Sequence, residues 1–221
     1  MRTKVPVVEK IMSANERIAA ENQARLNEAG VFSLNFMASP GAGKTSLIER
    51  TVPALAGAFQ VAVVDGDIAT SLDADRAAAA GAIAVQINTG GECHLDAVML
   101  QGALEQLDLS EVEILIVENV GNLICPANFA LGTHKNVLIA SVPEGDDKPY
   151  KYPGMYLNVD ALVVNKIDLQ PYVEFDMERF CRGVQVLNEG LETFPLSCKT
   201  GEGLDAWLGW LKRQARQFSE G

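Results

Sequence analysis

The sequence lacks a long apolar run and an obvious leader segment. No apolar stretch in its 221 residues reaches the roughly 18 residues that a helix needs to cross a bilayer. The first ten residues, MRTKVPVVEK, contain no signal-peptide core. We therefore expect no membrane segment and a cytoplasmic location.

Basic residues are also scarce. The chain has 18 Lys and Arg against 29 Asp and Glu, a formal net charge of −11. Such a chain has no general affinity for nucleic acid or for an anionic membrane surface. Any phosphate ligand must therefore be attracted by a local arrangement of groups.

Cysteine is limited to Cys93, Cys125, Cys181 and Cys198. In a cytoplasmic protein these residues are expected to be core side chains, metal ligands or reactive thiols, not disulfides. The composition is otherwise that of a folded protein, with 48% hydrophobic and 21% charged residues.

Short apolar segments alternate with helical segments from residue 31 onward. Several apolar segments are continuous runs of Val, Ile and Leu, as in strands that are covered on both faces. This order predicts an α/β fold with a mainly parallel, seven-stranded sheet, helices on both faces and ligands at the carboxyl ends of the strands. The predicted strands are 31–37, 61–64, 83–87, 113–117, 137–142, 161–165 and 194–196, and the predicted helices are 44–57, 72–80, 94–108, 174–189 and 203–218.

Residues 1–30 show apolar side chains at helical spacing and end at Gly30, a plausible helix terminus. No linker or repeat divides the rest. We expect a single domain, 1–221, with an N-terminal helix in 1–30 and a core in 31–221 that carries the phosphate-binding loop (P-loop) described next.

Residues 38–45 read ASPGAGKT, between a predicted strand and a predicted helix. This is the phosphate-binding loop G-x-x-x-x-G-K-[ST] with Ala38 at its first position, a change that affects the turn. Lys44 can reach the β- and γ-phosphates, Thr45 can bind Mg²⁺, and successive amides face the anion. The predicted nucleotide-binding residues here are Gly41, Ala42, Gly43, Lys44, Thr45 and Ser46.

Asn165-Lys166-Ile167-Asp168 follows a predicted strand and favours guanine. The Asp168 carboxylate can accept hydrogen bonds from N1–H and the exocyclic amine of guanine, whereas adenine lacks this donor pair. Lys166 can lie over the base, and Asn165 can tie this loop to the phosphate loop. Read alone, the string could instead place Asp168 as a helix cap.

Ser197-Cys198-Lys199 follows the last predicted strand. It resembles the Ser-Ala-Lys loop that contacts guanine O6 in GTPases. Cys198 replaces the usual alanine, and we expect it mainly to pack.

Acidic residues follow two more strands: Asp65 and Asp67 in Asp-Gly-Asp, and Glu118. They are natural Mg²⁺ ligands, directly or through water, although Asp65 could serve as a helix cap. No glutamine stands where Ras-like enzymes position water, so we expect slow hydrolysis with Lys44 and Asp67 as the catalytic groups.

Cys93-His94 and Cys125 are not explained by nucleotide binding. Thiolate and imidazole suit Ni²⁺ or Zn²⁺ rather than Mg²⁺. Three ligands do not fill a four-coordinate shell, so a dimer could share the metal. The alternative is a buried thiol and a helix-capping histidine. Cys181 is expected in the core and His134 in a surface loop.

The combined motifs resemble the HypB family, the nickel-incorporation GTPases of NiFe-hydrogenase maturation. The resemblance covers nearly the whole chain. It is carried by ASPGAGKT, GDIATSLDADR, NTGGECHLDA, ENVGNLICPANFALG, PEGDDKPYKYP and VNKIDL.

The resemblance implies a GTP-hydrolysing metallochaperone that dimerises with GTP bound and binds nickel or zinc through Cys93, His94 and Cys125 at the dimer interface. It implies Thr45, Asp67 and Glu118 as Mg²⁺-linked switch residues. Its implied partners are a nickel-binding chaperone of the HypA type and the hydrogenase large-subunit precursor. No cysteine precedes Cys93, so we expect no separate N-terminal nickel store.

Three alternatives remain open. A urease-type nickel GTPase is disfavoured because its Cys-Pro-His pattern is missing at Cys93-His94. The second alternative is a GTP-dependent adaptor protein with a structural zinc site. The third is a P-loop kinase for a small metabolite, which the guanine-type segment Asn165-Lys166-Ile167-Asp168 opposes. The segment 144–153 (EGDDKPYKYP) is either a solvated turn or, by the resemblance, a border of the nucleotide or dimer interface, with no role assigned to Asp146 or Lys148.

Overall fold

The computed structural model describes residues 7–67, 71–122 and 124–221. The parts of two sequence motifs at residues 68–70 and at position 123 lie outside this range. All seven predicted strands are present and form one parallel sheet in the order β3-β2-β4-β1-β5-β6-β7. Their bounds are Phe32–Ala38 (β1), Val61–Asp67 (β2), Ile83–Asn88 (β3), Ile114–Glu118 (β4), Lys135–Ser141 (β5), Ala161–Asn165 (β6) and Glu192–Pro195 (β7).

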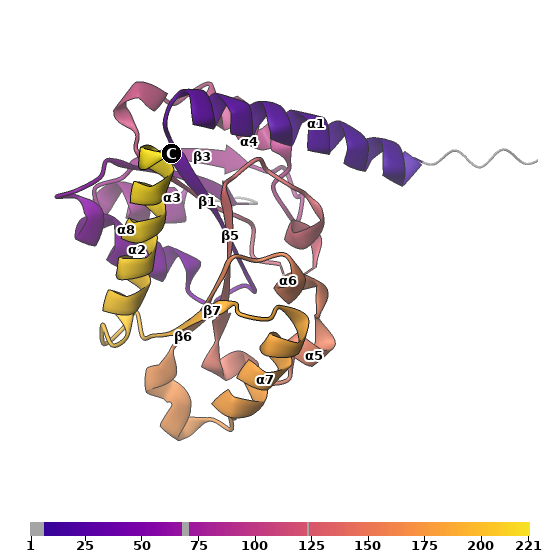
Figure 1. Ribbon diagram of the computed structural model, residues 1–221, viewed down its shortest axis with the longest axis vertical. Helices are drawn as coiled ribbons and strands as arrows, with labels where there is room; N and C mark the ends of the chain where they lie inside the picture. Colours follow the sequence, from indigo (N-terminus) through magenta and orange to yellow (C-terminus); the bar gives the residue numbers. More distant parts are fainter. Residues whose placement is uncertain (1–6, 68–70, 123) are drawn as a thin grey trace, which may run out of the picture.

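One face of the sheet is covered by α2 (Lys44–Leu55), α3 (Leu72–Ala79) and α8 (Leu204–Glu220), which Figure 1 shows together on one side. Alternate residues of each strand point to this face, such as Val61 and Val63 in β2. They pack with the apolar sides of α2 and α8, including the fully buried Trp207. The continuous apolar runs predicted from the sequence thus reflect burial on both faces.

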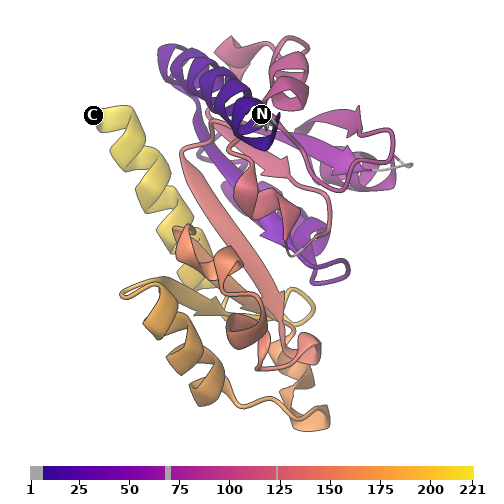
Figure 2. The same cartoon turned by 90° about the vertical axis from the view of Figure 1, so that its right-hand side faces the viewer.

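The opposite face is covered in two parts. The helices α1 (Val7–Glu28) and α4 (Ala97–Leu104) pack on the β2–β4 half. The β5–β6 half is covered by α6 (Gly154–Leu157) and α7 (Met177–Leu187), with α5 (Lys148–Lys151) beside α7. Figure 2 shows α1 at one end of this side and α7 at the other. Short 3₁₀ segments lie at Leu109–Glu111 (η1), Cys125–Asn128 (η2), Val142–Glu144 (η3) and Ile167–Tyr172 (η4).

One predicted boundary was wrong in a way that matters for the site, and one of the two readings of the segment 144–153 was wrong as well. The helix predicted at 94–108 begins only at Ala97, because Asp96 caps it by accepting a hydrogen bond from the Met99 amide at 2.8 Å. The Cys93-His94 pair therefore lies in the loop before α4. The segment 144–153 is not a simple solvated turn, because it contains the end of η3 and all of α5.

The topology gathers the motif residues at one edge. Since all strands are parallel, their carboxyl ends meet there. The phosphate loop leaves central β1, the carboxylates of Asp67 and Glu118 end β2 and β4, and Asn165 ends β6. Within the described residues, none of the helices combines the length and apolar character required to span a membrane.

Candidate functional site

The phosphate loop has the shape that its glycines predict. Gly43 has φ +105°, a conformation that side-chain-bearing residues rarely adopt, and a Cβ there would collide with the Asn165 amide. This close approach lets Asn165 Nδ2 donate to the Ala42 carbonyl at 3.0 Å. Lys44 and Thr45 open α2 and line a cavity of about 500 Å³ with Gly41, Gly43 and Ser46. The Ala42 side chain is buried in the core, so it faces a ligand only through its backbone.

The two loops are joined a second time by Lys166. Its Nζ donates to the Gly41 carbonyl at 2.6 Å, and its φ of +64° is the one positive φ of a non-glycine residue among the described residues. The side-chain oxygen of Asn165, Oδ1, accepts from the Lys166 backbone amide at 2.7 Å and from the Cys198 backbone amide at 3.1 Å. The positive φ of Lys166 is a strained backbone conformation, and these surrounding hydrogen bonds hold it in place.

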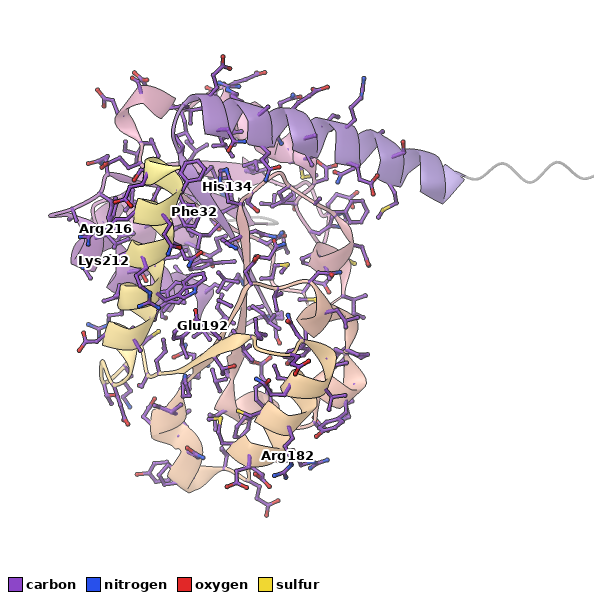
Figure 3. The ribbon with its side chains drawn as sticks, in the orientation of Figure 1. Phe32, His134, Arg182, Glu192, Lys212 and Arg216 are labelled. Carbon is purple, nitrogen blue, oxygen red and sulfur yellow. The ribbon has the colours of Figure 1, made fainter. Side chains whose placement is uncertain are left out.

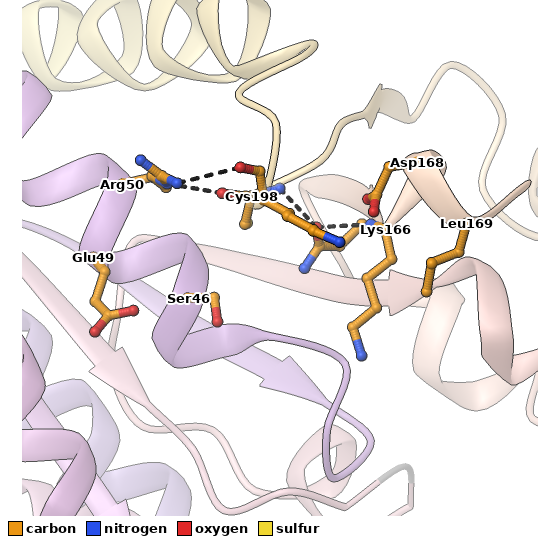
Figure 4. A pocket seen from close by; sticks show the side chains of 9 residues that line it. Ser46, Glu49, Arg50, Lys166, Asp168, Leu169 and Cys198 are labelled. Carbon is orange, nitrogen blue, oxygen red and sulfur yellow. Dashed lines mark hydrogen bonds between the residues drawn. The ribbon is translucent and has the colours of Figure 1, made fainter.

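A second cavity of about 630 Å³ adjoins the phosphate loop, and Figure 4 shows its lining side chains. Ser197 Oγ, fully buried, donates to Asp168 Oδ1 at 2.6 Å and so fixes that carboxylate. Burial raises the pKa of the Cys198 thiol to about 11, so the thiol stays neutral and packs. The cavity is lined by Ser46, Glu49, Arg50, Asn165, Lys166, Asp168, Leu169, Cys198 and Lys199.

Arg50 was not predicted from the sequence. Its Nε donates to the Cys198 carbonyl at 2.7 Å, which ties α2 to the loop after β7. The two residues lie 148 positions apart, and no local pattern in the sequence signals their contact.

The carboxylates beside the phosphate loop form a buried cluster. Thr45 Oγ1 donates to Glu118 Oε1 at 2.8 Å, and ligand oxygens of Asp65, Asp73 and Glu118 lie within 4.8 Å of one another. Within the part of the chain that the structure describes, one oxygen of Asp65 and one of Glu118 are buried without a hydrogen-bond partner. Oxygen donors left unpaired in this way fit a hard cation such as Mg²⁺.

Burial is the main cause of the raised pKa values in this cluster. It raises the pKa of Glu118 to about 7 and that of Asp65 to about 6, with the charges of Asp73 and Asp67 adding to the Asp65 shift. Asp65 also accepts a hydrogen bond from the Ala74 amide in the first turn of α3, as a helix-capping residue does, and its role as an Mg²⁺ ligand stays a prediction. Asp67 lines the same cavity but lies outside the three-residue cluster. Asp73, which the sequence reasoning missed, takes part through α3.

The three softer donors also come together. Cys93 Sγ lies 3.2 Å from Cys125 Sγ and 3.8 Å from His94 Nδ1. The His94 ring packs on Phe129 at a centroid distance of 4.0 Å. Contact with Cys93 raises the pKa of the Cys125 thiol. Cys93 is exposed, and Asp96, not His94, caps α4, so the reading of a buried thiol and a capping histidine was wrong.

Leu95 connects this cluster to the carboxylates of Asp65, Asp73 and Glu118 beside the phosphate loop, which we call the nucleotide carboxylates. It follows His94 and is fully buried, and a Cβ on Gly66 would lie 2.7 Å from its side chain. The Leu95 amide donates to Asn119 Oδ1 at 3.0 Å. Gly66 and Asn119 directly adjoin the acidic residues of β2 and β4. The two clusters are therefore joined through the contacts of Leu95 with Gly66 and Asn119.

Other predicted residues lie apart from these clusters. Cys181 is partly buried against the core, as expected. His134 is in a loop but is not simply a surface residue, because it is half-buried between β1 and α8. In the 144–153 segment, Glu144 accepts a short hydrogen bond from Ser39 of the phosphate loop, and Asp146 pairs with Arg179 at 3.0 Å. Burial raises the pKa of Glu144.

Comparison with known proteins agrees with this geometry. Residues 33–195 match the family model described as CobW/HypB/UreG, nucleotide-binding domain. The hydrogenase maturation factor HypB of Azotobacter vinelandii is 47% identical over 208 residues, 94% of this chain and 69% of the relative. That of Escherichia coli K12 is 43% identical over 204 residues, 92% of this chain and 70% of the relative.

Solved structures agree as well. The crystal structure of HypB from Helicobacter pylori in complex with nickel matches with a TM-score of 0.88 and 38% identity, over 92% of this chain and 96% of that one. The HypB structure from Archaeoglobus fulgidus matches with a TM-score of 0.86 and 36% identity, over 92% and 99% of the two chains. The chain therefore belongs to the HypB family of P-loop GTPases, within the CobW/HypB/UreG nucleotide-binding domains.

Proposed function

We propose that the chain is a GTP-hydrolysing metallochaperone that binds nickel or zinc and helps insert nickel into the NiFe-hydrogenase large subunit. The observation that carries the proposal is the close grouping of Cys93, His94 and Cys125, with donor atoms within 4.8 Å, beside the nucleotide carboxylates. The relatives named as hydrogenase maturation factors, and the nickel complex of one of them, support it.

In this proposal the chain is one GTPase domain, and its nucleotide lies across the two cavities. The base enters the cavity at Asp168, whose carboxylate Ser197 holds in place, and the phosphates meet the amides of residues 41–46 and the Lys44 ammonium. Thr45, Glu118 and Asp65 or Asp67 would hold Mg²⁺, which when bound offsets the negative charge of the phosphates. With no glutamine positioned for water, hydrolysis is slow, and Lys44 stabilises the developing charge.

The metal to be delivered is held by three donors from each chain. Ni²⁺ and Zn²⁺ favour four or more ligands, so a second copy of the chain completes the shell in a GTP-dependent homodimer. The exposed position of Cys93 leaves it accessible to such a copy. The proposed partners are a nickel-binding chaperone of the HypA type and the hydrogenase precursor.

Nucleotide state reaches the metal through Leu95. Movement of β2 or β4 on loss of the γ-phosphate would displace Gly66 or Asn119, both of which contact this residue. A tenfold difference in metal affinity between the GTP and GDP states requires a coupling free energy of about 1.4 kcal/mol. Displacement of a single ligand is enough for that.

The proposal is tested by titrating wild type and Cys93→Ala with nickel, in GDP and in a non-hydrolysable GTP analogue, while measuring particle size. We expect tighter nickel binding in one nucleotide state and a dimer with the analogue. Cys93→Ala should lower nickel affinity at least tenfold and reduce the metal content of the dimer. Unchanged stoichiometry and dimerisation in Cys93→Ala would defeat the interface-metal proposal.

The same titration separates the adaptor alternative, in which Cys93, His94 and Cys125 hold a structural zinc ion. A structural site should keep zinc in both nucleotide states and resist exchange by nickel. Free exchange that depends on the nucleotide supports a delivery site.

A further inference from the structure

The N-terminal helix α1 docks on the body through an unusual stripe. Among the α1 side chains that the structure describes, four at helical spacing are buried: Asn15, Ala19, Asn22 and Leu26. Two of them are amides, which lose hydrogen bonds to water when buried and so need partners within the protein. Figure 1 shows α1 lying beside α4. Docking alone would be served by apolar side chains, so the partners of the two asparagines are informative.

Both asparagines bond to the same two segments. Asn15 Oδ1 accepts from the Ala97 amide at 2.9 Å, and its Nδ2 donates to the Ala130 carbonyl at 2.8 Å. Asn22 Nδ2 donates to the Ala97 carbonyl at 2.8 Å and to the Leu131 carbonyl at 3.0 Å. Each amide side chain therefore bridges the start of α4 and the segment after η2.

Both segments follow the soft donors directly along the chain. Ala97 follows His94 by three residues, and Ala130 follows Cys125 by five. The first bridged segment is thus continuous with the loop of Cys93 and His94, and the second is continuous with Cys125 through η2. Among the described residues no strand pairing joins these loops, since they leave β3 and β4, which are not neighbours in the sheet, and they meet directly where Asn122 Nδ2 donates to the Cys93 carbonyl at 3.3 Å.

Backbone packing reinforces the bridge. Gly132 has φ +90°, and a Cβ there would collide with the Ala19 carbonyl of α1 and lie 2.9 Å from Asn22 Cβ. The chain after Cys125 thus runs directly against α1. Leu26 is buried with Leu100, Leu104 and Leu131, which anchors the end of the helix to both segments.

We propose that Asn15 and Asn22 are positioning residues that make α1 a bracket, holding the Cys93–His94 loop and the Cys125 loop at the separation that nickel binding requires. The inference rests on the proposed function of these three donors. A donor set held in place before the metal arrives loses less conformational freedom on binding. Loosening either asparagine should therefore weaken metal binding without touching a ligand.

The test uses Asn15→Leu and Asn22→Leu in the full chain, since leucine has a similar shape and removes the hydrogen bonds. Arg25→Met is the matched control. Arg25 also lies on α1 and donates to α4, but at the Leu104 carbonyl (2.9 Å), at the end of α4 remote from the metal loops. Asn15→Asp keeps an acceptor for the Ala97 amide and removes the donor to Ala130, so it breaks only one side of the bridge.

Two readouts are combined. Ni²⁺ affinity is measured by titration in the presence of a GTP analogue, and the rate of capture by a monoarsenical reagent, which needs two adjacent thiols, reports the Cys93–Cys125 separation without nickel. GTP affinity and thermal unfolding show that each variant is folded. We expect nickel affinity to fall about tenfold or more in both leucine variants and about threefold or more in Asn15→Asp, and arsenical capture to slow by similar factors.

Wild-type values in Asn15→Leu and Asn22→Leu would overturn the bracket. Equal losses in Arg25→Met would also overturn it, because they would show that any weakening of α1 docking suffices. Absence of nickel binding in wild type would defeat the proposed function instead, while the arsenical rates would still decide whether α1 sets the separation of the loops.

Discussion

Asp168 shows how much a single carboxylate contributes at the scale of one residue. Its oxygens are acceptors, one of them already bound by Ser197 Oγ, and it lines the cavity beside the phosphate loop. Asp168→Asn replaces an acceptor by a donor opposite the guanine amine. We expect GTP affinity to fall roughly 100-fold, about 2.7 kcal/mol, because a buried donor would face a donor.

The same variant should bind xanthosine triphosphate better than wild type does, since the base carries an oxygen where guanine carries the amine. Competition against a fluorescent GTP analogue measures both affinities. Ser197→Ala, which keeps the carboxylate and removes only its support, should show a smaller loss with unchanged base preference. A uniform loss for all bases in Asp168→Asn would contradict direct base recognition.

Residues in contiguous motifs were predictable, and residues that act across the fold were not. Lys44, Thr45 and Asn165 lie in strings whose spacing carries their chemistry, and the structure brings all three to one edge of the sheet. Arg50 lay in no such string, and GDIATSLDADR gave Asp73 no role, because the contacts of both residues depend on how α2 and α3 pack. Asn15 was overlooked for a related reason, since a polar residue in a helix is usually exposed.

At the scale of elements, the strands were predicted best. Their apolar runs reflect burial on both faces. The observed strand ends differ from the predicted ends by two residues or fewer, except that β2 continues three residues further. Helix starts were harder where a loop carried function. The apolar pattern extends back toward His94, but Asp96 is the N-cap, so the helix begins only at Ala97. Cys93 and His94 therefore lie in an irregular loop. The short α5 and α6 contain proline and glycine, which mask a helical pattern.

His134 joins three elements and makes their packing sensitive to pH. Its ring packs on Phe32 of β1 and Phe218 of α8. Figure 3 shows His134 and Phe32 next to the C-terminal end of α8. The Ser33 amide donates to Nδ1 at 3.0 Å, so the neutral ring carries its proton on Nε2, facing Asn27 Oδ1 at 2.7 Å. Burial, followed by the charge of Lys135, lowers the pKa of His134 below 6.5.

The sign of the effect follows from linkage. As pH falls through about 6.5, the unfolded chain takes up the proton before the folded chain does, so the free energy of unfolding decreases until the folded pKa is passed. We expect metal-free wild type to lose more stability than His134→Phe between about pH 7 and pH 5, because only wild type carries this titrating ring. Urea unfolding at each pH measures this. Parallel pH profiles would show that His134 does not contribute.

At the scale of the whole molecule, parallel topology supplies the architecture of the site. Every strand delivers its carboxyl end to the same edge, so residues far apart in sequence, from the phosphate loop to Asp168, meet without long-range signals of their own. That part of the site follows from the fold class. The contact between the nucleotide carboxylates and the soft donors does not, because it depends on Leu95 packing against Gly66.

Net charge is a property of the whole chain, and it makes a prediction about the proposed dimer. Two copies with a formal charge of −11 each repel one another, and bound GTP adds further negative charge. Salt screens this repulsion, since the Debye length falls from about 30 Å at 0.01 M to about 8 Å at 0.15 M. We therefore expect the dimer dissociation constant, with a saturating GTP analogue, to fall several-fold over that range. Sedimentation velocity measures it, with nucleotide occupancy checked at each salt concentration. If salt instead weakens the dimer, ion pairs across the interface outweigh the net repulsion, and the acidic surface of the chain has no part in limiting association.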